Sequence, residues 1–446
     1  MAIRSLISTI VFLMAAATLS AQSLTFQGNT LRVLEETPDK STGLDKIYVL
    51  YSLQGVSVSY TSASDADVKW MKYSNLGGGY AEYTASSQNG RVSTLDNLEG
   101  DMGYIVEDGY KRYYFWVTDY GQHRLKLNSV SASSEQECGV SLIDVVGSGN
   151  PIRYYTVNGM QKTLSQDISI EYNTQEWSEQ SNNYIQTHVE NTFESLQSQY
   201  RLTPPNYCNT TFRVTGDKFL RAWNWEESVE SASVNPTSVT AQTYAVSESS
   251  AESDKASNLI GSSEEGLGGS APCEVTFEAY VTDGIIHNEW QLTTDPTFEY
   301  IDYRFNTQDL DYTFLDEGTH YVRYIGSNSD GSCEYTGDTY EINIGESQLL
   351  IPNAFSPNGD GVNDEWKVAY RSILTFQCHI FDRNGHQVCH LTSPEQGWDG
   401  KVNGKFVDSG VFFYVIEATG ADGKKYKKSG DINVVKYVGN VGTATR

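Results

Sequence analysis

Residues 351–366 read IPNAFSPNGDGVNDEW, and this stretch decides the fold of the C-terminal part of the chain. It concentrates four kinds of turn-forming residue in one short segment. Glycine permits positive φ, proline fixes φ at about −65°, and asparagine and aspartate close turns through their own side chains. The segment is therefore predicted to be an ordered loop, neither helix nor strand, with Phe355 and Trp366 anchoring it in a core.

The residues after this loop alternate apolar and polar side chains, as half-buried strands do. The pattern is clearest in YRSILTF (370–376), CHIFDRNGHQVCHL (378–391) and NGKFVDSGVFFYVIEAT (403–419). A compact β-domain is therefore expected at the C-terminus.

Residues 351–436 resemble the gliding-motility-associated C-terminal domain, which is the type B sorting domain of cargo exported by the type IX secretion system. In the loop, the matching residues are Pro352, Asn353, Phe355, Ser356, Pro357, Asn358, Gly359, Asp360, Gly361, Asn363, Asp364 and Trp366. Further matches are Phe381-Asp382-Arg383, Gly385, Gly397, Trp398, Asp399, Gly400, Asn403-Gly404, Ser409-Gly410-Val411 and Tyr414. The chain departs from the family at Asn384, where tryptophan is usual, at Cys378 and Cys389, and in the extra residues Tyr437–Arg446.

The resemblance implies an immunoglobulin-like sorting domain in which the matching loop residues together with Trp398, Asp399, Gly400 and Gly410 are read by the type IX translocon. It further implies retention at the outer face of the outer membrane by a PorP/SprF-like barrel protein. Residues 271–346 loosely resemble a PKD-like module, a kind that often precedes such sorting domains. We therefore expect an accessory or structural component of the secretion or surface machinery. A surface adhesin or glycan-binding protein and a secreted hydrolase remain the alternatives.

Residues 1–21, MAIRSLISTIVFLMAAATLSA, have one basic residue, an apolar run and small residues, which is typical of a signal peptide. No later stretch reaches the roughly 18 apolar residues of a membrane span. The chain is therefore expected to leave the cytoplasm and not to span a membrane.

The formal net charge of −26 is unevenly distributed. Residues 350–446 hold 11 Lys/Arg and 10 Asp/Glu and are nearly neutral. Residues 22–349 hold 19 Lys/Arg and 47 Asp/Glu, a net charge of −28. Nucleic acid is excluded as an expected partner, because phosphate binding requires basic surface. The acidity indicates either a solvated surface or docking to a basic partner or calcium.

Length and composition predict a string of β-sandwich domains. The expected divisions are 1–21 signal peptide, 22–134 Ig-like sandwich with Trp70 in its core, 135–206 β-rich domain, 207–270 sandwich with a Ser/Glu/Gly-rich loop or linker at 246–270, 271–346 PKD-like sandwich, and 350–446 sorting domain. Residues 208–223 and 273–290 show an imperfect repeat, which predicts two copies of one sandwich. Apolar residues between Ile185 and Tyr200 fall at helical spacing, which predicts one short helix.

Six cysteines in an exported chain favour disulfides over free buried thiols. If 382–385 is a hairpin turn, stepping outward places Cys378 opposite Cys389, close enough for a bridge. Cys273 and Cys333 bracket one module and are expected to pair. Cys138 and Cys208 then pair by elimination.

Two clusters allow more than one interpretation. Asn358, Asp360, Asn363 and Asp364 offer hard oxygen ligands for Ca²⁺, or they form Asx turns without a metal. Lys424, Lys425, Lys427 and Lys428 protect a hairpin edge, or they dock to an acidic surface.

The sequence contains no recognisable catalytic constellation. The seven histidines show no paired zinc spacing, and there is no G-x-S-x-G nucleophile elbow. Neither an enzyme nor a bound cofactor other than calcium is expected.

Overall fold

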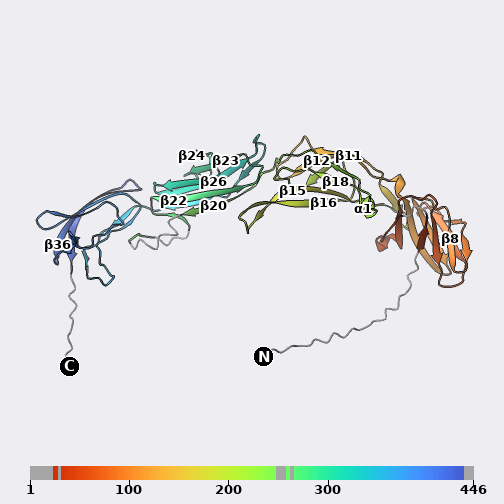
Figure 1. The fold of residues 1–446 in the computed structure, drawn as a ribbon, viewed down its shortest axis with the longest axis horizontal. Coiled ribbons are helices and arrows are strands. Elements are labelled where there is room, and N and C mark those ends of the chain that lie inside the picture. The colour runs from red at the N-terminus through yellow and green to blue at the C-terminus, as the bar shows by residue number, and fades with distance from the viewer. Residues whose placement is uncertain (1–23, 29–31, 248–257, 262–265, 436–446) are drawn as a thin grey trace, which may run out of the picture.

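The computed structural model describes residues 24–28, 32–247, 258–261 and 266–435. The predicted signal peptide and the tail Tyr437–Arg446 lie outside these residues. Nearly all regular structure is β, in four sandwich-like modules that follow one another in a row (Figure 1). We refer to 24–123 as module 1, 124–240 as module 2, 241–346 as module 3 and 347–435 as module 4.

Module 1 is a sandwich of a four-stranded sheet (β1-β4-β8-β7) and a six-stranded sheet (β2-β3-β10-β9-β5-β6). Trp70, predicted to be a core residue, is 1 % exposed between the two sheets. The strands are β1 Leu24–Gln27, β2 Val33–Glu36, β3 Lys46–Leu50, β4 Ser57–Thr61, β5 Val68–Tyr73, β6 Glu82–Thr84, β7 Ser87–Asn89, β8 Val92–Leu95, β9 Met102–Asp108 and β10 Lys111–Asp119, with short 3-10 turns at Lys40–Thr42 and Tyr120–Gln122.

The six-stranded sheet of module 1 is buried on both faces. Tyr48 and Phe115 point towards the four-stranded sheet, whereas Ile47 and Trp116, one residue away in each strand, belong to the core of module 2. Successive strand residues face opposite sides, so this alternation buries two apolar layers. Modules 1 and 2 therefore share one continuous core.

Module 2 contains the sheets β11-β12-β17 and β16-β15-β18-β19 and the hairpin β13-β14. Its elements are β11 Lys126–Ala132, β12 Ser141–Ser148, β13 Ile152–Tyr155, β14 Gln161–Leu164, β15 Ile168–Ser178, β16 Asn183–Phe193, β17 Gln199–Leu202, β18 Arg213–Thr215, α1 Lys218–Ala222 and β19 Ser228–Glu230. The predicted helix between Ile185 and Tyr200 is wrong, because β16 pairs with β15 along its whole length. A spacing of four residues keeps side chains on one face of a strand as well as of a helix, and β-branched Thr187, Val189 and Thr192 favour the strand.

The predicted sandwich at 207–270 is also wrong. β18 and β19 complete the sheet of β15, with Phe212 and Val214 in the module 2 core. β20 instead pairs with β22 of module 3. The predicted boundary at 206 therefore falls inside one module, and the two repeat segments are parts of different sheets rather than two copies of one sandwich.

Module 3 packs the sheet β20-β22-β25 against the sheet β21-β28-β26-β23-β24, with β27 paired to β26. Its strands are β20 Ala241–Ser247, β21 Leu267–Gly269, β22 Cys273–Val281, β23 His287–Thr293, β24 Tyr303–Phe305, β25 Leu310–Phe314, β26 Gly318–Ser327, β27 Glu334–Thr336 and β28 Tyr340–Ile344. Trp290, fully buried, lies at the centre of its core.

Module 4 is built on the five-stranded sheet β30-β37-β36-β32-β33, with two small ribbons, β29-β31 and β34-β35. Its strands are β29 Gln348–Leu350, β30 Ala354–Phe355, β31 Ala369–Arg371, β32 Ile373–Phe381, β33 Gln387–Leu391, β34 Lys401–Val402, β35 Lys405–Phe406, β36 Gly410–Gly420 and β37 Lys425–Val434. The module has its own core around Trp366, Ile380 and Ile416.

The disulfide predictions are wrong in every pairing. The structure joins Cys138, in the turn between β11 and β12, to Cys333, which precedes β27. Cys208, Cys273, Cys378 and Cys389 are free thiols. The prediction for Cys273 and Cys333 assumed a bridge within one module, whereas the fold brings turns of modules 2 and 3 together and joins Cys333 to Cys138.

Cys378 and Cys389 fail to pair because the hairpin departs twice from the expected register. Phe381 lies opposite Gln387 rather than His386, and a bulge follows. The register shifts between Ile380 and Phe381, so Cys378 lies opposite Leu391 and Cys389 lies opposite Ile380. Cys378 is fully buried, and burial raises the pKa of its thiol to about 12.

Candidate functional site

The 351–366 loop, which the sequence singled out, wraps one side of module 4. Its first half adds the short strand β30 in parallel to β37, with Phe355 opposite Val434. Its last residue, Trp366, is fully buried and donates its indole N–H to the carbonyl of Pro352 at 2.8 Å. The predicted anchors Phe355 and Trp366 therefore both lie in the core.

The exposed tip of the loop is organised by one carboxylate, that of Asp364. Its Oδ1 accepts the amide N–H groups of Asn358 (2.9 Å) and Gly359 (2.6 Å), and its Oδ2 accepts that of Gly361 (2.7 Å). These backbone hydrogen bonds, those from Gly359 and Gly361 first, lower the pKa of Asp364. Gly359 and Gly361 both have positive φ (78° and 86°), which glycine adopts without strain.

The remaining candidate calcium ligands serve the same turn. Asn358 Oδ1 accepts the Asp360 amide at 2.9 Å, and Asp360 Oδ1 accepts the Val362 amide at 2.8 Å. These are Asx turns, so the loop is ordered by its own carboxylates and amides. Among the described residues no three His, Cys, Asp or Glu side chains are grouped as ligands for a metal. Calcium binding by this loop remains a prediction.

The Gly397–Gly400 segment holds the base of the loop. Backbone N–H and C=O groups of Trp366 and Trp398 exchange two hydrogen bonds of 2.9 and 3.0 Å. The Asp399 carboxylate accepts a hydrogen bond of 2.7 Å from the Lys401 ammonium, and this hydrogen bond lowers the pKa of Asp399. Gly400 has φ 74°, and a Cβ there would lie 3.1 Å from Pro357 Cγ. The sequence correctly placed Trp398, Asp399 and Gly400 with the loop in one domain, and the structure puts them in contact.

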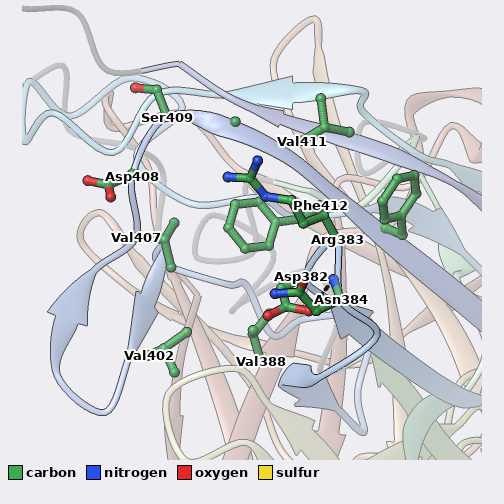
Figure 2. Close-up of a pocket in the computed structure, with 12 residues that line it drawn as sticks. Asp382, Arg383, Asn384, Val388, Val402, Val407, Asp408, Ser409, Val411 and Phe412 are labelled. Carbon is green, nitrogen blue, oxygen red and sulfur yellow. Dashed lines mark hydrogen bonds between the residues drawn. The ribbon is translucent and has the colours of Figure 1, made fainter.

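A groove of about 650 Å³ lies beside the loop, at the end of module 4 farthest from module 3. We call it the tip groove. Three turns that are distant in sequence form it: the β32–β33 turn, the β34–β35 ribbon with the residues after it, and the start of β36 (Figure 2). Its lining residues are Asp382, Arg383, Asn384, Val388, Val402, Val407, Asp408, Ser409, Gly410, Val411, Phe412 and Phe413.

A row of aromatic rings connects the loop to the tip groove. Phe355 and Trp398 have ring centroids 5.4 Å apart, and Trp398 and Phe412 have centroids 5.0 Å apart. Phe412 lines the groove. Of the predicted site residues, only Gly410 lines the groove itself. The others were missed because no single stretch of sequence carries them; the matching tripeptides 381–383 and 409–411 were the available signal.

The four lysines lie at the opposite end of module 4. Lys424 precedes β37 and its ammonium lies 5.1 Å from the ring centroid of Tyr426. Lys427 forms an ion pair with Glu417 at 3.2 Å across β36 and β37. This end faces module 3, because Ala421, in the turn between β36 and β37, packs in the module 3 core. The structure therefore does not bring the lysines together with the loop.

No helix in the described part of the chain has the length and apolar character needed to cross a membrane.

Comparison with known proteins identifies two of the modules. Residues 349–434 match the family model of the CHU_C type IX secretion signal domain, and residues 129–231 match that of a fibronectin type III domain. The second match crosses position 206, in agreement with a single module there. A search of curated proteins finds no match.

Several solved structures are similar to the chain at low sequence identity and low TM-score. The FN1–FN3 domains of chicken CNTN1 are 9 % identical, with 64 % of this chain and 94 % of that chain covered and a TM-score of 0.19. The three N-terminal domains of the bacteriophage RB49 outer capsid protein Hoc are 10 % identical, with 70 % of this chain and 100 % of that chain covered and a TM-score of 0.22. Dimeric latent PorU from Porphyromonas gingivalis is 11 % identical, with 73 % of this chain and 35 % of that chain covered and a TM-score of 0.16.

Proposed function

Module 4 is a type IX secretion signal domain, and from this premise we propose that the chain is a non-enzymatic surface protein held outside the cell by an outer-membrane partner. The signal domain supports export by the type IX system to the cell surface. The finer part of the proposal is that a PorP/SprF-like barrel protein retains the chain, which serves as an accessory or structural component of the surface machinery.

The observation that carries this proposal is that module 4 is a folded domain with a preformed loop. Trp366 fixes the base of the loop in the core and Asp364 organises its exposed tip, so a receptor that reads the loop does not have to order it first. An unfolded tail would lose conformational entropy on binding, which weakens recognition. A compact address domain at the end of the chain therefore suits export of the modules before it.

The three preceding modules support a structural role. Module 2 is of the fibronectin type III kind, which is not a catalytic kind of domain. Modules 1 and 2 share a core, and modules 2 and 3 share a disulfide. These connections suit a stiff spacer that projects from the cell surface.

Deletion of residues 347–446 tests the proposal. The truncated chain and the full chain are produced in the native host, and protease accessibility on intact cells is compared with the periplasmic content. We expect the full chain at the surface and the truncated chain, still folded, in the periplasm. Surface display of the truncated chain would overturn the export role. Release of the full chain into the medium by a host that lacks the barrel protein would support retention, and unchanged attachment would contradict it.

A further inference from the structure

We propose that the tip groove is the docking site for an extended peptide segment of the outer-membrane partner, one that carries an apolar side chain next to an acidic one. This inference rests on the proposed function, and it specifies which surface of module 4 holds the exported chain at the membrane.

Part of the lining of the tip groove is apolar. Val388 of β33, Val402 of β34, Val407 after β35 and Phe412 of β36 line one hollow (Figure 2). On the neighbouring outer face of β36, Val411 and Phe413 are 45 % and 47 % exposed. Apolar side chains gathered at a concave site are what an apolar anchor residue of a partner fills.

The backbone at the groove offers an unpaired strand edge. β32 ends at Phe381, opposite Phe413, whereas β36 begins three residues earlier, at Gly410. Gly410, Val411 and Phe412 therefore pair with β37 alone, and their second edge faces the groove. An extended peptide can add to such an edge through main-chain hydrogen bonds while its alternate side chains enter the floor.

The charges at the rim select the partner. Arg383 and Asp408 have no ion-pair or hydrogen-bond partner within the described residues, and both are exposed. In contrast, Asp382 beside them accepts the amides of Asn384 and His386. A free guanidinium forms bidentate hydrogen bonds with a carboxylate. Arg383 therefore favours an acidic residue on the bound peptide segment.

The position of the groove suits attachment to a membrane protein. The tip groove lies at the start of β36, and the joint with module 3 lies at the end of the same strand, about 33 Å away at 3.3 Å per residue. A partner bound at the groove therefore leaves the joint free, and modules 1 to 3 extend away from the attachment point (Figure 1).

The test uses the full chain with Arg383→Glu and, separately, Val402→Asp. Lys69→Glu in module 1 and Val146→Asp in module 2 are matched controls, since both positions are exposed and far from module 4. We expect all four variants to reach the exterior with unchanged melting temperatures. The two groove variants should fall at least tenfold in cell-attached protein and appear in the medium, whereas the controls stay attached.

Photo-crosslinking from position 402 in intact cells gives the second measurement. An adduct with an outer-membrane protein that is lost in Arg383→Glu, and absent from position 146, would support the site. Wild-type attachment of both groove variants, or a crosslink to a second copy of this chain, would overturn it. Accumulation of folded groove variants in the periplasm would also overturn it, because the groove would then serve export rather than retention. The truncation distinguishes the two proposals: if it blocks export while the groove variants stay attached, the proposed function stands and this inference fails.

Discussion

Module 3 is joined to its two neighbours in different ways. On the module 2 side, the Cys138–Cys333 disulfide bridges the joint, and Trp177 packs on Tyr280 with ring centroids 5.5 Å apart. Gln175 and Asp283 add a reciprocal pair of hydrogen bonds, each 2.9 Å. On the module 4 side, residues 258–260 pair with Tyr370, Leu259 packs against the module 4 core, and further hydrogen bonds join small polar groups and backbone.

Ser372 is the centre of the joint between modules 3 and 4. It is fully buried, accepts the Ala271 amide at 3.1 Å and donates its hydroxyl to the Gly345 carbonyl at 2.6 Å. Its own amide donates to Ser270 Oγ at 2.7 Å. Ala421, in the turn between β36 and β37, completes the module 3 core.

The two joints therefore differ in kind. A disulfide and aromatic packing join modules 2 and 3, whereas modules 3 and 4 are joined by hydrogen bonds, a short paired segment and the apolar contacts of Leu259 and Ala421. We expect substitutions at the two joints to differ accordingly in the size of their effects.

Removing the disulfide should have the largest effect. Cys138→Ser/Cys333→Ser opens a loop closed over 195 residues, and we expect about 4 kcal/mol less free energy of unfolding for modules 2 and 3. Denaturant unfolding measures this loss, and small-angle scattering should show a broader distribution of lengths. Cys389→Ser is the control, since that thiol is free. Five or more alkylatable thiols in the unreduced wild-type chain would contradict the bridge.

Ser372→Ala should weaken the other joint by about 1–3 kcal/mol, because it leaves the buried Ala271 amide and Gly345 carbonyl without their partner. We expect module 4 to reorient relative to module 3 while both modules keep their separate unfolding transitions. Ser429→Ala, at an exposed position in β37, provides the control. A scattering profile identical to wild type would show that Ser372 does not fix the orientation.

Tyr426→Phe removes the hydroxyl that donates to the Ser347 carbonyl. We expect it to lower the free energy of unfolding of module 4 by about 1 kcal/mol. The measurement is the melting temperature of module 4 in the full chain. Tyr110→Phe, in an exposed turn of module 1, should change nothing. Equal melting temperatures for the two variants would rule out a role for this hydrogen bond.

Acidification should have the smallest effect of the four changes, and it should act on the 351–366 loop. The pKa of Asp364 is lowered in the folded state, so its stabilising contribution is complete above the ordinary carboxyl value of about 3.9 and is lost as pH falls through the lowered value. The protection factors of the Gly359 and Gly361 amides, which compare their exchange with the intrinsic rate at each pH, should fall only in that acidic window. A fall in protection near neutral pH would assign the loop's order to another group.

Local sequence patterns predicted the elements that depend on nearby residues. The turn residues of 351–366 required a loop, and alternation predicted the strands of module 4 and the buried side of Trp70. These features arise from φ preferences and from the period of a strand, which act over a few residues. The resemblance of 351–436 to a secretion signal domain was confirmed for the same reason, since its motifs are short and ordered along the chain.

Tertiary structure alone decided the long-range pairings. A shifted turn and a bulge in the β32–β33 hairpin separated Cys378 from Cys389, and the packing of two modules placed Cys138 beside Cys333. The helix predicted between Ile185 and Tyr200 became β16 because an adjacent strand was available, and a spacing of four fits either structure. The tip groove likewise exists only where three segments distant in sequence meet. No single sequence motif therefore contains all of its residues. Sequence determines what each segment can form, and the burial of apolar faces between distant segments determines which segments meet.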